Sequence, residues 1–161
     1  MINSPAAFLC GRFVYKGDLN IMKVCILYAA KGKDSSNIKK IASALARGIE
    51  EQNNIVDLVD IKLEGTKIIS YYDYLIIGTE AINTFGGKIP QNISTFLRNS
   101  GTISGKRCMA FVTKGGIRSG KTLQALMKVM ESEGMYLKTS DVIDKEAMAT
   151  AIGKRLHIES N

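Results

Sequence analysis

The 161-residue chain has no tryptophan, two prolines and three cysteines. Cys10, Cys25 and Cys108 show no C-x-x-C spacing, so neither a disulfide framework nor a thiolate metal site is expected. Cys25 and Cys108 stand inside apolar runs, where a cysteine is usually a small core residue. Because such cysteines are typical of a reducing compartment, we expect a cytoplasmic protein.

Long hydrophobic runs, repeats and low-complexity tracts are also missing. No apolar run approaches the roughly 20 residues needed to cross a bilayer, so no membrane association is expected. Met1 to Leu9 carries no basic residue before its short apolar patch and lacks the charged region of a signal peptide. Residues 1–21 are interpreted as an extension preceding a domain over residues 22–161. The alternative is an ordered arm that packs through Phe8, Phe13 and Tyr15.

From Met22 onward, the spacing of the apolar residues changes regularly along the chain. Short apolar runs alternate with stripes at helical spacing, which indicates βαβ units around a buried parallel sheet. The predicted strands are residues 24–28, 55–61, 74–77, 108–112 and 136–142. In the second of these, Asp57 and Asp60 alternate with apolar residues, as in an edge strand.

Four helical stripes separate or follow these strands. The apolar residues expected to face the core are Ile38, Ile41, Ala42, Leu45 and Ile49, then Ile93, Phe96 and Leu97 within 91–99, then Leu123, Leu126, Met127 and Met130, and finally Met148, Ala151, Ile152 and Leu156. The polar cluster 34–37 supplies cap residues before the first helix. Right-handed crossovers favour a three-layer α-β-α fold of the α/β class, a doubly wound five-stranded parallel sheet with order 2-1-3-4-5.

Ligands of such sheets bind outside the carboxyl ends of the strands, so three loops are candidate binding segments. The loop 29–37 places small residues, hydroxyls and lysines before a helix, which favours an anion; simple helix capping is the alternative. In the loop 78–90, glycines flank Phe85, which could pack on a flat ring or fold back onto the core. The third loop follows residue 113 and contains the first residues of the octet 115–122.

The octet 115–122 matches G-x-x-x-x-G-K-[ST], the phosphate-binding loop of P-loop nucleotidases. Such a loop usually follows an early strand, whereas here most of the domain precedes it. The candidate Mg²⁺ ligand, Asp144, follows a weak strand. Nucleotide binding by Lys121 is therefore the less favoured hypothesis, and an ordinary loop-to-helix junction is the simpler one.

Formal net charge is +7. The three loops contain six cations against two acids: Lys31, Lys33, Lys88, Lys114, Arg118 and Lys121 against Asp34 and Glu80. This excess attracts anions such as phosphates, nucleotides or acidic partners. No basic helix or aromatic-interleaved stripe is present, so a nucleic-acid partner is not expected.

Several segments together resemble the flavodoxin and flavodoxin-like family. They are the strand 56–60, the run 72–79, the Gly-Lys-Ile-Pro of 87–90 and the Gly-Lys-Arg of 105–107. The resemblance covers nearly all of residues 22–156, including the order of elements. It implies flavin mononucleotide (FMN) as cofactor, with its phosphate in the first loop and its ring between the second and third.

Carried onto this chain, the resemblance implies one set of FMN-binding residues. They are Ala30, Lys31, Gly32, Ser35, Ser36, Asn37, Thr79, Glu80, Ala81, Ile82, Asn83, Thr84, Phe85, Gly86, Thr113, Lys114, Gly115, Gly116 and Ile117. The chain departs from the family at Ser36, where glycine is usual, and at Ile38, where threonine is usual. It lacks a ring-stacking tryptophan, and its positive charge contrasts with typically acidic electron carriers.

The resulting expectation is a flavodoxin-like protein that binds FMN and takes part in electron transfer or flavin-dependent redox chemistry with an unidentified partner protein. No side chain is expected to act as a catalytic acid or nucleophile, and no metal is expected. His157, the single histidine, is interpreted as a surface residue. A flavin-free module of the same fold, acting in regulation or interaction, is the alternative.

Overall fold

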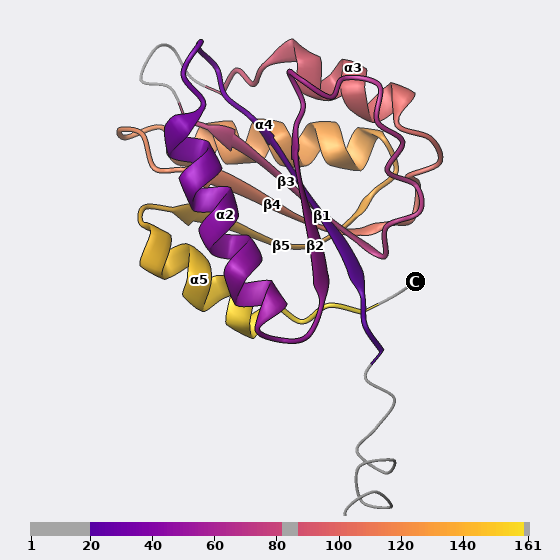
Figure 1. The fold of residues 1–161 in the computed structure, drawn as a ribbon. Coiled ribbons are helices and arrows are strands. Elements are labelled where there is room, and N and C mark those ends of the chain that lie inside the picture. Colours follow the sequence, from indigo (N-terminus) through magenta and orange to yellow (C-terminus); the bar gives the residue numbers. More distant parts are fainter. Residues whose placement is uncertain (1–19, 82–86, 160–161) are drawn as a thin grey trace, which may run out of the picture.

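Five apolar runs pair as one parallel sheet in the computed structural model, which describes residues 20–81 and 87–159. The strands are β1 (Lys23–Ala29), β2 (Ile55–Asp60), β3 (Tyr74–Glu80), β4 (Arg107–Thr113) and β5 (Tyr136–Ile143). They lie in the order β2-β1-β3-β4-β5, which confirms the predicted topology (Figure 1). Asp57 lies on an edge strand, as its alternating pattern predicts.

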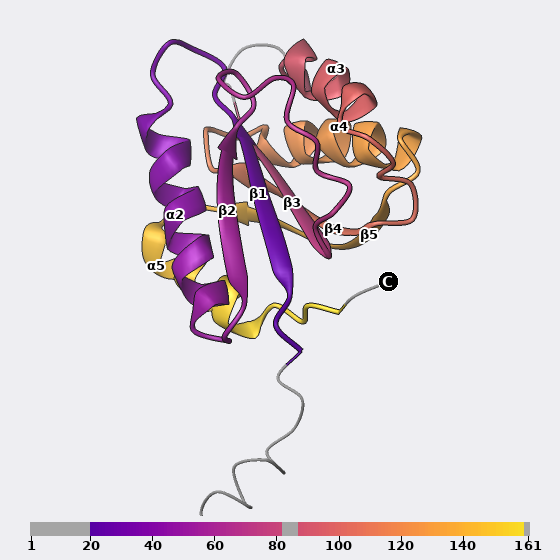
Figure 2. The same cartoon turned by 45° about the vertical axis from the view of Figure 1, so that its right-hand side comes forward.

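Helices cover both faces of this sheet. They are α2 (Ser36–Glu50), α3 (Gln91–Asn99), α4 (Ser119–Ser132) and α5 (Glu146–Arg155). Figure 2 shows α2 and α5 on one face and α3 and α4 on the other. The central strands β1, β3 and β4 are buried along almost their whole length, because both of their faces are covered.

The crossover from β2 to β3 contains no helix. Residues 61–73 run as turns and irregular chain, and they cover part of the α3 and α4 face by burying Ile61, Ile69 and Tyr72. This matches a sequence in which no helical stripe is found between the second and third strands. Among the described residues, no helix combines the length and the apolar character needed to cross a membrane.

Both cysteines that the structure describes lie in one of the two apolar layers. Cys25 and Cys108 are fully buried in the layer beneath α3 and α4, and burial raises the pKa of each thiol to about 12. Their interpretation as core residues is confirmed. Cys10 and the aromatic residues of the expected arm, Phe8, Phe13 and Tyr15, lie outside the described residues.

The buried face of α5 differs from the expected one. Met148 and Ala151 are exposed, whereas Ala149 and Gly153 are buried and face α2. A Cβ atom built on Gly153 would lie 2.4 Å from the carbonyl oxygen of Leu45. The helix is therefore oriented by a close backbone contact through small residues, which a search for large apolar side chains does not detect. Of the four expected core residues, Ile152 and Leu156 do pack against this layer.

Candidate functional site

The loops after β1, β3 and β4 lie at one edge of the sheet. The chain leaves β1 for α2 on one face and leaves β3 for α3 on the other (Figure 2). Because β1 and β3 are neighbours, their diverging connections form a topological switch point, where open α/β sheets place their ligands. The structure brings together the described residues of all three predicted segments at this edge.

A buried hydrogen bond joins β1 and β3 directly beneath the switch point. The Thr79 hydroxyl donates to the carbonyl oxygen of Ala29 over 2.9 Å, and both residues are buried. Just above, the backbone N–H of Lys31 donates to Glu80 Oε2 over 3.4 Å. Thr79 is thus a scaffold residue whose hydroxyl is occupied, whereas Lys31 and Glu80 tie the first loop to the second.

The second and third loops touch through a glycine. The backbone N–H of Ala81 donates to the Thr113 carbonyl over 3.4 Å, which extends the β3–β4 pairing by one residue. A Cβ atom on Gly115 would lie 2.1 Å from the carbonyl oxygen of Ala81. Only a glycine therefore fits at position 115 with the loops in this arrangement.

The third loop closes on itself through Ser119. The Ser119 hydroxyl accepts from the N–H of Gly115 over 3.1 Å and donates to the carbonyl of Gly116 over 3.3 Å. Gly116 has a φ of +70°, a conformation that favours glycine. The next residue, Ile117, is fully exposed at the tip. An apolar side chain in that position is available to cover a flat ligand.

These contacts do not fit a phosphate-binding P-loop. In such a loop the glycine-rich backbone presents free N–H groups, and the Ser or Thr hydroxyl reaches Mg²⁺. Here the Gly115 N–H is already bonded to Ser119, and Thr122 is only 2% exposed. The octet instead builds the turn from β4 into α4, with Lys121 exposed in the first turn of the helix.

The first loop presents an acidic group at the start of α2. Asp34 Oδ1 accepts from the backbone N–H of Ser36 over 2.9 Å, and hydrogen bonds from Ser36 hold the pKa of Asp34 below its usual range. Ser35 occupies the cap position but makes no side-chain cap bond. The expected capping cluster thus acts through Asp34, and Ser36 and Asn37 remain exposed.

Sequence reasoning placed Asp34 in the capping cluster and Ser119 in the octet, but it did not assign the role that each has here. Ser119 closes the third loop, and a serine four residues after Gly115 at a helix start is a signal that could have identified it. Asp34 competes for the helix N-terminus, and its place two residues before Ser36 is typical of an Asx turn. Five predicted residues, Ile82, Asn83, Thr84, Phe85 and Gly86, lie outside the described part of the chain.

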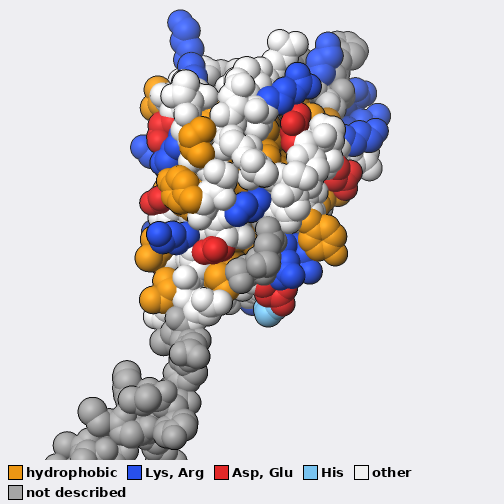
Figure 3. Space-filling view, turned by 90° about the vertical axis from the view of Figure 1, so that its right-hand side faces the viewer, with side chains coloured by type: hydrophobic (Ala, Val, Ile, Leu, Met, Phe, Trp, Pro, Cys, Tyr) orange, Lys and Arg blue, Asp and Glu red, His pale blue; other side chains and the backbone are white. Residues whose placement is uncertain are grey.

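Positive charge surrounds this edge. Lys114 Nζ lies 3.9 Å from Asp144 Oδ2, while the other five loop cations are exposed and pair with no described residue. On the face drawn in Figure 3, basic side chains are interspersed with acidic and apolar ones. Within the described residues, no group of three or more histidine, cysteine or carboxylate side chains is arranged to hold a metal ion.

Solved structures with the same fold are numerous, although their sequences are distant. The oxidised flavodoxin 1 of Bacillus cereus superposes with a TM-score of 0.63 at 20% identity, covering 84% of this chain and 99% of that one. A flavodoxin from the domain Archaea gives 0.60 at 20% identity, over 83% and 94%. The two-electron reduced flavodoxin of Megasphaera elsdenii gives 0.60 at 16% identity, over 81% and 96%.

At these identities the likeness shows a flavodoxin-like fold. No protein-family model matches the chain, and no curated protein matches it in sequence. The similarity therefore rests on the order and packing of the elements and not on one shared sequence signature. The sequence resemblance rests on the order of elements in the same way.

Proposed function

We propose that the protein binds FMN in the crevice at the β1/β3 switch point and takes part in electron transfer or flavin-dependent redox chemistry. The observation that carries this proposal is the joining of three loops at that edge. Thr79 bonds to Ala29 beneath it, and Gly115 lets the third loop approach Ala81. A glycine at this position lets the third loop lie directly against the second, so backbone of both loops would be available beside a flat ring.

The described residues offer complementary roles. Exposed backbone at the start of α2, together with Lys31, would hold the phosphate through N–H groups and positive charge. Backbone of the second and third loops would flank the ring, and the exposed Ile117 side chain would exclude water from one side. When bound, the flavin supplies the electron-transfer chemistry, and the protein supplies binding, orientation and limited access.

One observation favours the flavin-free alternative. The carboxylate of Asp34 already accepts from the Ser36 N–H at the helix start, where a phosphate would bind. A carboxylate and a phosphate repel each other and compete for the same donors. If the chain does not bind FMN, Asp34 is the residue that the structure points to as the reason.

FMN titration tests the proposal. Freshly purified protein should show flavin absorbance in the visible range, or should quench the fluorescence of added FMN. Riboflavin should bind more weakly because it lacks the phosphate. A protein that neither carries flavin nor takes up FMN would sink the proposal and leave the flavin-free module.

A variant of Gly115 localises the site. Gly115→Val should weaken FMN binding strongly, since its side chain would displace the third loop from Ala81. Gly120→Ala is the matched control, because a Cβ atom at Gly120 meets nothing within 4 Å. Equal loss of FMN binding in both variants, or in neither, would place the flavin elsewhere.

The charge of the chain bears on the redox partner. With a net charge of +7 and five loop cations that pair with no described residue, the binding edge suits an acidic partner protein and disfavours a basic one. Electron exchange with the partner should slow as salt is added, since the attraction is screened beyond about 10 Å at 0.1 M.

A further inference from the structure

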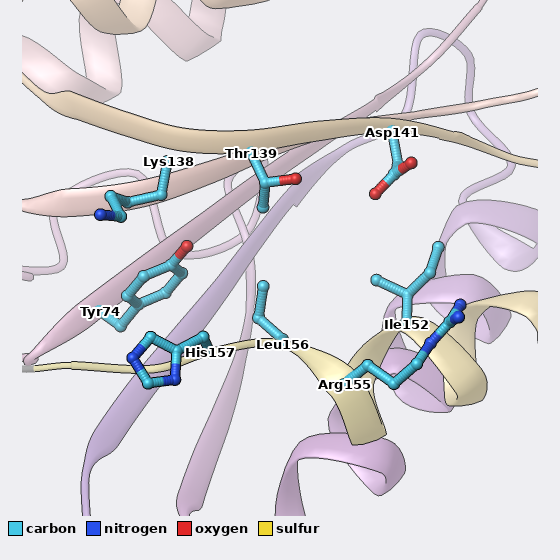
Figure 4. A pocket seen from close by; sticks show the side chains of 8 residues that line it. All are labelled: Tyr74, Lys138, Thr139, Asp141, Ile152, Arg155, Leu156 and His157. Carbon is cyan, nitrogen blue, oxygen red and sulfur yellow. The ribbon is translucent and has the colours of Figure 1, made fainter.

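A pocket lies between β5 and α5, away from the proposed FMN site. Its volume is about 390 Å³, and Figure 4 shows the side chains that line it. Tyr74, which contributes its ring, is the first residue of β3, whereas Glu80 at the crevice is the last. At about 3.3 Å per residue, the two ends of this strand are roughly 20 Å apart. None of the loop residues described above lines this pocket.

Tyr74 leaves a polar atom without a partner in this pocket. The residue is fully buried, and its hydroxyl forms no hydrogen bond with any described residue. In Figure 4 the hydroxyl points toward the strand that carries Lys138 and Thr139. Burial raises the pKa of Tyr74, so the hydroxyl stays neutral and is a hydrogen-bond donor. A buried donor of this kind is stabilised when a ligand accepts from it.

An irregularity in β5 adds a cation to the same side of the pocket. The pairing of β4 with β5 jumps from Cys108↔Leu137 to Met109↔Thr139, which leaves Lys138 as the extra residue of a bulge. Bulges redirect side chains and are frequent beside binding sites. The Lys138 ammonium lies 5.4 Å from the ring centre of Tyr136, an exposed contact that a stronger ligand contact could replace.

The remaining lining is partly apolar, with one acid at the far end. Ile152 and Leu156 form an apolar wall on the helix side, while Asp141 and Arg155 face each other at the end away from Tyr74 (Figure 4). Arg155 Nε donates to the Ala151 carbonyl over 3.2 Å. His157, beneath Tyr74 in the figure, is paired with Glu159.

We propose that this pocket binds a small amphipathic carboxylate with a single negative charge. The carboxylate accepts from the Tyr74 hydroxyl and from Lys138, and the apolar body lies on Ile152 and Leu156. At the other end Asp141 offsets the charge of Arg155, so that end offers no net positive charge for a second carboxylate. Pockets of this volume and partly apolar lining are typical of small organic ligands.

The site is tested by adding benzoate to the full chain and detecting its binding by backbone amide NMR. Its addition should shift resonances of β5 and α5 in a saturable manner, equally with and without added FMN. Benzylamine and benzyl alcohol, which have the same ring without the negative charge, should bind at least about tenfold more weakly. Competition between benzoate and FMN, or no saturable shift, would overturn the proposal. Equal shifts with inorganic phosphate would also overturn it, because they indicate a general anion patch.

Two variants and one control assign the contacts. Tyr74→Phe removes only the hydroxyl, and Lys138→Gln removes the charge; each should weaken benzoate binding about tenfold, as expected for a hydrogen bond to a charged group. Lys128→Gln, on the exposed face of α4 across the sheet, should leave it unchanged. Melting curves should show Tyr74→Phe folded and at least as stable as the parent protein without benzoate. Unchanged benzoate affinity in a folded Tyr74→Phe variant would overturn the assignment.

Discussion

The Cα atoms of Gly48 and Gly153 face each other where α2 crosses α5, without a side chain between the two helices. A Cβ atom built on Gly48 would lie 2.9 Å from Gly153 Cα and 2.3 Å from the carbonyl oxygen of Thr150. The Thr150 hydroxyl donates to the Ala44 carbonyl over 3.1 Å at the same contact. Because α2 also begins at the proposed phosphate loop, this contact helps to position one side of the proposed FMN site.

Substitution of Gly48 by alanine should destabilise the protein. The added methyl group meets backbone atoms that cannot move aside, so the free energy of unfolding should fall by about 1–3 kcal/mol. Urea denaturation measures this change. Gly120→Ala, in open space within the first turn of α4, should instead leave stability unchanged or raise it by up to about 1 kcal/mol. Equal stability of the two variants would contradict the close helix contact.

Thr79→Val should lower stability. The change keeps the shape but removes the second donor to the Ala29 carbonyl, which also lies in the β1–β3 ladder, so we expect a cost of about 0.5–1.5 kcal/mol for the lost hydrogen bond. Thr113→Val is the control, since Thr113 is buried on the neighbouring strand and its hydroxyl has no bond to a described residue. Chemical denaturation of both variants gives the comparison. A Thr79→Val protein as stable as the Thr113→Val protein would show that the bond adds nothing.

Asp34→Asn should strengthen FMN binding. Removing the negative charge at the start of α2 relieves its repulsion of the phosphate, and for exposed groups we expect about a two- to fivefold gain. Fluorescence titration with FMN and with riboflavin distinguishes the cause, because the gain should be absent for riboflavin. A gain of the same size for both ligands would mean that Asp34 acts on something other than the phosphate.

Alkaline pH should destabilise the fold. The pKa of Cys25 and of Cys108 is raised to about 12 by burial, so the unfolded chain releases these protons first, from about pH 9 upward. The folded state then binds more protons than the unfolded state, and stability falls with rising pH until about 12. Urea midpoints between pH 8 and 11 measure the slope in a Cys10→Ser background. Adding Cys25→Ala and Cys108→Ala should reduce the slope; an unchanged slope would assign it to the buried tyrosines alone.

The periodicity of the chain was sufficient to predict most of the fold. The helix at 91–99 lies within its expected bounds, and each predicted strand lies within two or three residues of the observed one. Apolar period is a local property, set by which residues alternate or recur every third or fourth position. The prediction was wrong at α5, where Met148 is exposed and Gly153 is buried. That contact depends on α2, about a hundred residues earlier in the chain.

By itself, the sequence determined the order of elements, the edge position of β2 and the three loops that carry the candidate site. These follow from hydrophobic pattern and chain connectivity, which are readable along one dimension. Only the tertiary structure decided which polar groups are free, both at those loops and at the opposite end of β3. It shows the Ser36 N–H held by Asp34, the Gly115 N–H held by Ser119, and the Tyr74 hydroxyl left without a described partner. Hydrogen-bond occupancy and close backbone approach depend on three-dimensional packing. The surroundings of the Tyr74 hydroxyl, for example, come from strands and helices that are distant in the sequence.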